Sequence, residues 1–166
     1  VWKARAGQGP VNFIEDRRGR YTVALKERLS AIKNERALSA KPDIFNGRLQ
    51  NLAHAVAVLD GRASVESIME ILSLPGGGNK WTKVDSLEAL LFAGARLDAD
   101  VVLAVLNPII ADALSDLYQD GQAKYLLKRC LCLLPFVDPP SAGVKRVKEV
   151  VLEARLPRFE LREVVT

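Results

Sequence analysis

The sequence predicts an all-α protein, an α-solenoid in which antiparallel helix pairs are stacked on one another. Apolar residues recur at spacings of three and four along most of the chain, as on the buried face of a helix. Proline, glycine and N-cap residues separate these segments, and one segment is repeated along the chain. Some stretches are rich in valine, but their spacing and their lengths above about ten residues favour helices over strands.

The chain is expected to begin with a segment that has little regular structure. Residues 1–20 contain three glycines and one proline and show little periodicity, which predicts a linker or arm. Residues 21–166 are predicted to form one α-helical repeat domain, in a chain that is a fragment of a longer protein. Its first helix is expected over 21–38, where four apolar residues share one face before Pro42. Further helices are expected over about 43–59, 65–72, 82–94, 98–117, 121–134 and 140–151, and one more from Pro157.

Local signals predict where several of these helices begin and end. Gly61 is the expected stop of the helix over 43–59. Ser64 and Asp98 stand where an N-cap oxygen would accept hydrogen bonds from the first free amides of a helix. Thr82, followed three residues later by Asp85, resembles a capping pair and predicts a further helix start.

The internal repeat is the most specific signal in the sequence. Residues 55–72 align with residues 89–106 at a constant offset of 34, and Arg62 then aligns with Arg96. A third unit follows at an offset of about 40, where Val137-Asp138 aligns with Leu97-Asp98. A unit of two helices cannot bury its apolar face alone, so neighbouring units must stack.

This pattern resembles HEAT or armadillo-like helical repeats over about residues 43–166. The resemblance implies that Arg62 and Arg96 pair with acidic neighbours, for which the candidates are Asp60, Asp98 and Asp100. The phrases at 87–94 and 131–140 also resemble the helical C-terminal regions of bacterial NACHT-type signalling ATPases. That second resemblance implies a sensor or scaffold region beside an ATPase module, for which this sequence has no Walker motif.

No catalytic, cofactor-binding or metal-binding residues are predicted, and hence no enzymatic activity. The only histidine, His54, lies among apolar residues of an expected helix, where a partly buried histidine is commoner than a catalytic base. The run Gly76-Gly77-Gly78-Asn79-Lys80 lacks the strand and the Gly-Lys-Ser/Thr sequence of a phosphate-binding loop. It is interpreted as a loop between repeats.

The two cysteines and the hydropathy predict a cytoplasmic protein without a membrane span. Cys130 and Cys132 are one residue apart in an apolar stretch, too close for an ordinary disulfide, and are expected to be reduced core thiols. The longest nearly uncharged run, 101–111, is about half of what a membrane-spanning helix needs.

Four residues are candidates for partner binding: Arg17, Arg18, Arg20 and Trp81. Residues 1–42 hold ten Lys or Arg against four Asp or Glu, whereas the rest of the chain holds fourteen against sixteen. The basic segment is therefore either a solvated helix face or linker, or a contact for phosphates. Trp81 is either a hydrophobic staple or an exposed anchor.

The predicted function is a non-catalytic protein-interaction scaffold or sensor region. Its partner would be another protein or another domain of its own chain, because stacked helix pairs present an extended binding surface. The alternative is a nucleic-acid-binding helical repeat that uses the basic N-terminal segment. Salt dependence separates the two, since phosphate binding weakens steeply as salt rises.

Overall fold

The computed structural model describes residues 10–74, 79–117 and 120–154, with side chains from residue 18 onward. In this stretch of the chain every regular element is helical, which confirms the all-α prediction. The α-helices are α1 (Pro10–Leu38), α2 (Asn46–Asp60), α3 (Val65–Leu72), α4 (Lys80–Phe92), α5 (Ala99–Ser115), α6 (Gly121–Leu133) and α7 (Pro140–Glu153). Three 3-10 turns join them: η1 (Pro42–Phe45), η2 (Gly61–Ser64) and η3 (Leu134–Phe136).

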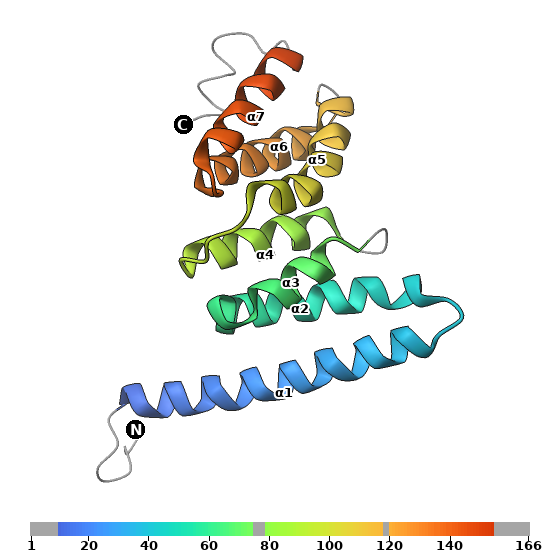
Figure 1. Cartoon of the computed structure of the whole chain (residues 1–166), viewed down its shortest axis with the longest axis vertical. Helices are drawn as coiled ribbons and strands as arrows, with labels where there is room; N and C mark the ends of the chain where they lie inside the picture. Colours follow the sequence, from blue (N-terminus) through green and yellow to red (C-terminus); the bar gives the residue numbers. More distant parts are fainter. Residues whose placement is uncertain (1–9, 75–78, 118–119, 155–166) are drawn as a thin grey trace.

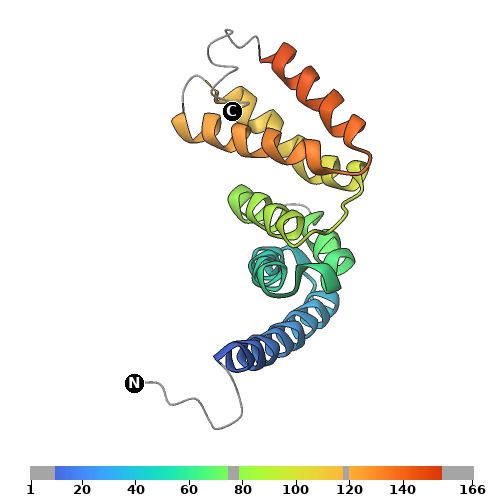
Figure 2. The same ribbon diagram turned by 90° about the vertical axis from the view of Figure 1, so that its left-hand side faces the viewer.

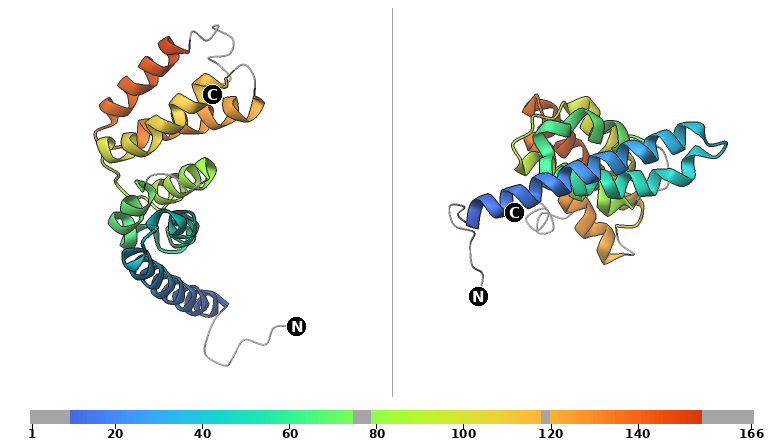
Figure 3. Two further views of the ribbon diagram at one scale, coloured as in Figure 1. Left: turned by 90° about the vertical axis from the view of Figure 1, so that its right-hand side faces the viewer. Right: turned by 90° about the horizontal axis from the view of Figure 1, so that it is seen from below.

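The helices are piled on one another along the long axis of the molecule, from α1 at one end to α7 at the other (Figure 1). Two columns of contacts run along this pile. In the first, α2 packs on α4 and α4 packs on α6; in the second, α3 packs on α5 and α5 packs on α7. Helix α1 contacts α2 and closes the first column (Figure 2). The pile is curved when seen from the side (Figure 3).

The core is continuous because the central helices are apolar on more than one side. In α4, Val84, Leu87 and Leu90 have no exposed surface. Helix α5 is apolar over a broad stripe, which allows it to contact α3, α4, α6 and α7. Each fully buried leucine or valine contributes about 1.5–3 kcal/mol from its burial, so the shared layers dominate the stability.

The turns between paired helices meet at one side of the pile, which we call the turn edge (residues 60–64, 93–98 and 134–139). Asp98 accepts hydrogen bonds from the amides of Asp100 and Val101 at 2.9 and 3.2 Å, which confirms it as the N-cap of α5. Backbone bonds of 2.8 Å join Ala99 N to Asp138 O and Asp138 N to Leu97 O. Neighbouring turns are thus tied directly to each other.

An arginine and two acids tie α6 to α4. Arg129 in α6 donates hydrogen bonds to Asp85, at 2.6 Å, and to Glu88, both in α4. Burial lowers the pKa of this arginine, but the two carboxylates more than offset burial, so the pKa is raised and the side chain stays charged. Asp85 is not part of a capping pair, because α4 begins at Lys80 and Asp85 lies inside it.

The predicted arm over 1–20 is wrong for residues 10–20, because α1 begins at Pro10. Proline suits the first position of a helix, where its missing amide hydrogen leaves no bond unmade. Arg18 donates through Nε to the carbonyl of Leu59 at 2.9 Å and so fastens this segment of α1 to α2. Gly19 has a low helix propensity, but α1 continues through it. Residues 1–9 lie outside the described residues.

Two helix-end predictions are also corrected, and a third is confirmed. Ser64 occupies the N-cap position of α3, but its side chain makes no capping hydrogen bond because η2 leads directly into the helix. Asn79, rather than Thr82, caps α4 by accepting from Trp81 N at 3.0 Å. Gly61 follows the last residue of α2, as predicted, although its conformation is right-handed; a Cβ there would lie 3.0 Å from the Cβ of Ala93.

The two cysteines differ, contrary to the prediction that both are core thiols. Both are free, and Cys130 is buried, but Cys132 is exposed because it lies on the outer face of α6. Burial raises the pKa of the Cys130 thiol to about 12. No helix in the described ranges combines the length and the apolar character that crossing a membrane requires.

Gly143 is predicted to be essential for the seat of α7. A Cβ at this position would lie 1.7 Å from the carbonyl oxygen of Leu134, which is backbone and cannot move aside locally. We expect Gly143→Ala to lower the free energy of unfolding by about 3 kcal/mol, measured by urea denaturation. Gly19→Ala is the control, because a Cβ there meets nothing within 4 Å. It should instead raise stability by about 0.5–1 kcal/mol. Equal effects of the two substitutions would contradict the packing of α7 described above.

Candidate functional site

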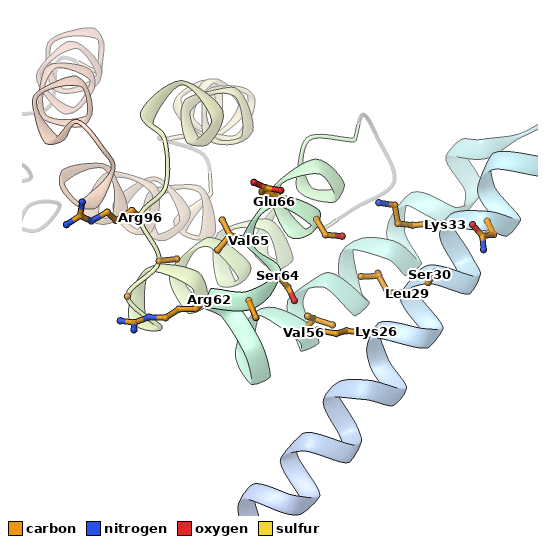
Figure 4. Close-up of a pocket in the computed structure, with 15 residues that line it drawn as sticks. Lys26, Leu29, Ser30, Lys33, Val56, Arg62, Ser64, Val65, Glu66 and Arg96 are labelled. Atoms are coloured by element: carbon orange, nitrogen blue, oxygen red, sulfur yellow. The ribbon is translucent and has the colours of Figure 1, made fainter.

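A long open groove with a volume of about 1220 Å³ runs between α1 and the start of α3 and reaches the turn between α4 and α5 (Figure 4). Helix α1 contributes one face, on which residues recur at helical spacing, and η2 with α3 contributes the facing wall. Fifteen residues line it: Lys26, Leu29, Ser30, Lys33, Asn34, Val56, Arg62, Ala63, Ser64, Val65, Glu66, Ser67, Gly94, Ala95 and Arg96.

The floor of the groove is apolar and its walls are polar. Leu29 and Val56 belong to the buried core and form the floor. Ser30, Ser64 and Ser67 line the walls, and their hydroxyl groups make no hydrogen bond within the described ranges of the chain. These hydroxyl groups are therefore available to a ligand.

The groove is lined by four basic residues and one acidic residue, Glu66. The two lysines, which lie on α1, are already paired: Lys26 with Asp60, and Lys33 with Glu70 at 2.6 Å. The two arginines stand at the turn edge, and neither has an acidic partner among the residues that the structure describes. Net positive charge is thus concentrated at one end of the groove.

The expectation that Arg62 and Arg96 pair with Asp60, Asp98 or Asp100 is wrong. Arg62 donates through Nε to the carbonyl of Ala93 at 2.5 Å, at the C-terminal end of α4. A cation at this position satisfies a free carbonyl and complements the helix dipole. Asp60 is taken by Lys26, and Asp98 caps α5, so neither acid is free to pair with these arginines.

Arg18 has the same role in the layer before. Its acceptor, the carbonyl of Leu59, occupies the position in α2 that Ala93 occupies in the 34-residue register. Each of these two helices is therefore capped at its C-terminal end by an arginine from an earlier element of the chain. Arg18 therefore stabilises the fold by capping α2.

The four candidate partner-binding residues do not form one site. The backbone of Arg17 lies in α1, but its side chain is outside the described side chains. Arg18 and Arg20 are exposed near the N-terminal end of α1, and neither lines the groove. Trp81 lies at the other end of α4 from the turn edge.

Trp81 is half-buried and is neither the predicted staple nor a free anchor. It is the second residue of α4, inside the helix that Asn79 caps, whereas a staple residue precedes the cap. Its ring packs against the core and lies 5.8 Å from the ring of Tyr125 in α6. The tryptophan therefore joins α4 to α6.

A smaller hollow of about 380 Å³ lies beside Trp81 and contains Asp112, Asp116 and Asp120. All three acids have partners: Asp112 pairs with Lys80 at 2.9 Å, Asp116 accepts a hydrogen bond from Ser115 Oγ at 3.4 Å, and Asp120 accepts one from Gln122 N at 2.8 Å as the cap of α6. Over the described ranges, no group of three or more His, Cys, Asp or Glu residues could hold a metal ion. The acids of this hollow are therefore explained by their contacts within the fold.

His54 is partly buried in α2, as the sequence predicts, but its Nδ1 has no hydrogen-bond partner. Gln50, one turn earlier, is fully buried, and neither of its side-chain polar atoms has a partner. Neither residue lines the groove, and neither therefore contributes to it.

Sequence reasoning considered Lys26 and Lys33 only as possible phosphate contacts of the basic segment, and it missed Ser30 as a member of a site. These residues share one edge of α1 beside the buried Leu29, and this spacing was visible in the sequence. What the sequence did not reveal is that η2 and α3 lie across from them. Comparison with known proteins adds no assignment: no protein-family model, curated protein or solved structure matches this chain.

Replacing Gln50 with leucine is expected to stabilise the protein. A buried amide without hydrogen bonds costs about 1–3 kcal/mol, and leucine has a similar volume. Urea denaturation of Gln50→Leu should show a higher midpoint by that amount, whereas Gln122→Leu, at an exposed position, should change little. A loss of stability in Gln50→Leu would mean that the amide is satisfied in solution.

Proposed function

We propose that this chain is a non-catalytic protein-interaction scaffold or sensor region built from HEAT-like helix pairs. The groove between α1 and α3 is its binding site, and its partner is another protein or another domain of its own chain. One observation carries the proposal: the groove offers three hydroxyl groups without a hydrogen bond and two arginines without an acidic partner, within the described residues. Such hydroxyl groups and arginines can form hydrogen bonds and ion pairs with a ligand.

The arrangement of the helices supports the HEAT-like interpretation. Helices α2, α4 and α6 stack in one column and α3, α5 and α7 in the other, and the turns within each pair lie at one edge. Stacked helix pairs of a solenoid have this arrangement, and they expose long surfaces made from successive layers. The groove crosses such layers, since α1, α3 and the α4–α5 turn all contribute to it.

The lining of the groove favours binding over catalysis. General acid–base or nucleophilic catalysis needs titratable groups that act together on one reacting atom. Glu66 is the one carboxylate among the lining residues, and the cations that share the groove with it are arginines and ion-paired lysines. The two free cysteines are consistent with a reducing compartment, and we extend the proposal to the cytoplasm.

The charge arrangement on α1 favours this proposal over the nucleic-acid-binding alternative. A phosphate backbone needs a track of unpaired cations. On α1, Arg18 is bonded to α2, Lys26 and Lys33 are paired, and Arg28 lies 3.9 Å from Glu35. Three of these cations are therefore paired with acids of the chain, and the fourth is held by a backbone carbonyl.

A random-peptide display library tests the proposed site. Peptides enriched on the chain should bind at least about tenfold more weakly to Ser67→Trp, because the indole fills the groove. Ser141→Trp, at an exposed position on α7, is the matched control and should bind them unchanged. The proposal fails if enriched peptides bind both variants equally. It also fails if only oligonucleotides bind, with affinity that falls steeply as salt rises.

A further inference from the structure

Arg62 and Arg96 form a pair at the turn edge. They occupy the same position in the 34-residue register, one in η2 and the other in the turn between α4 and α5. Both are exposed, and Figure 4 shows both side chains directed to the same side of the pile, at the end of the groove away from α1. Successive layers thus present the same cationic group along one edge.

These arginines hold the positive charge that the groove does not neutralise. Arg62 uses Nε on the carbonyl of Ala93, which leaves its two terminal nitrogens without an acidic partner, and Arg96 makes no hydrogen bond or ion pair within the described residues. The lysines at the other end are paired with Asp60 and Glu70. A ligand therefore gains most binding free energy from contacts with these two guanidinium groups.

The geometry points to an acidic, extended peptide segment of a partner protein as the ligand of this groove, with its carboxylates bound by Arg62 and Arg96. This inference rests on the proposed function and names the chemistry of the partner. Guanidinium groups bind carboxylates through two parallel hydrogen bonds, which gives both affinity and orientation. The free hydroxyl groups of Ser64 and Ser67 lie beside the path of such a segment and can bond its backbone.

Phosphate also binds arginine, but the groove suits a protein segment better than a nucleic acid. Each strand of a nucleic acid carries one charge about every 3.4 Å, whereas the groove offers two unpaired cations and places Glu66 between its two ends. A peptide can instead place its acidic residues only where the arginines are.

The spacing of the layers predicts the pattern of the segment. Packed helices lie about 8–10 Å apart, and an extended chain in the polyproline II conformation advances about 3.1 Å per residue and returns to the same face every three residues. Acidic residues about three positions apart would therefore meet the two arginines. Ala63, Val65 and Ala95 line the groove nearby and favour small apolar side chains between the acids.

The test uses a fluorescent peptide of about twelve residues with repeating Glu-Ser-Val triplets, and a second peptide with Gln in place of Glu. Fluorescence anisotropy should show that the chain binds the Glu peptide and not the Gln peptide. Arg96→Glu should weaken binding at least about tenfold, as expected when a charged hydrogen bond is lost. Urea denaturation should show the variant to be as stable as the original, because Arg96 makes no hydrogen bond or ion pair with the residues that the structure describes.

Lys145→Glu is the matched control, because it makes the same change of charge at an exposed position on α7, away from the groove. Its affinity for the Glu peptide should change less than about twofold. The inference is overturned if the Glu peptide does not bind, if both variants weaken binding equally, or if a single-stranded oligonucleotide binds and the peptide does not. If display peptides without acidic residues bind in a way that Ser67→Trp abolishes, this inference fails and the proposed function stands.

Discussion

The apolar contact between α4 and its two neighbours in the first column is the interaction on which the rest of the structure depends. Helix α4 is short, yet Val84, Leu87 and Leu90 are fully buried, because α2 covers it on one side and α6 on the other. Such a helix cannot be stable alone, since isolated helices of this length are marginal in water. The contact also sets the distance between layers, and hence where the turns meet at the turn edge. The hydrogen bonds from Arg129 to Asp85 and Glu88 fix the position of α6 along α4.

The candidate groove follows from how α1 closes this column. Leu29 and Ile32 anchor α1 against the core, and the same helix carries Lys26, Ser30 and Lys33 on the adjoining edge. Because η2 and α3 lie opposite that edge, a polar groove with an apolar floor results. The arginines at its end do two things. Arg62 caps α4 through Nε, and its remaining nitrogens, with those of Arg96, supply the cationic group on which the proposed recognition of an acidic segment depends.

The features that could be predicted from the sequence are those set by neighbouring residues. The three-and-four spacing gave the helical class and the burial of Leu87 and Leu90, and Asp98 was identified as a cap from its position before an apolar run. Features that depend on distant segments were missed. The start of α1 is stabilised by a bond from Arg18 to Leu59, the ring of Trp81 packs near Tyr125, and Arg62 meets a carbonyl instead of an acid. The groove joins α1 to residues more than twenty positions away in the sequence, so its shape could not be predicted from local patterns.

The dependence of neighbouring layers on α4 is tested most directly by hydrogen exchange on Leu87→Asp. This substitution buries an unpaired carboxylate, which costs several kcal/mol, at a residue with no exposed surface. Phe92→Asp, at a residue of the same helix that is 84% exposed, is the control and should leave exchange unchanged. The account predicts that in Leu87→Asp the amides of α2 and of α6 both exchange at least about tenfold faster, because each layer shelters the next. Faster exchange confined to α4, with α2 and α6 still protected, would contradict it.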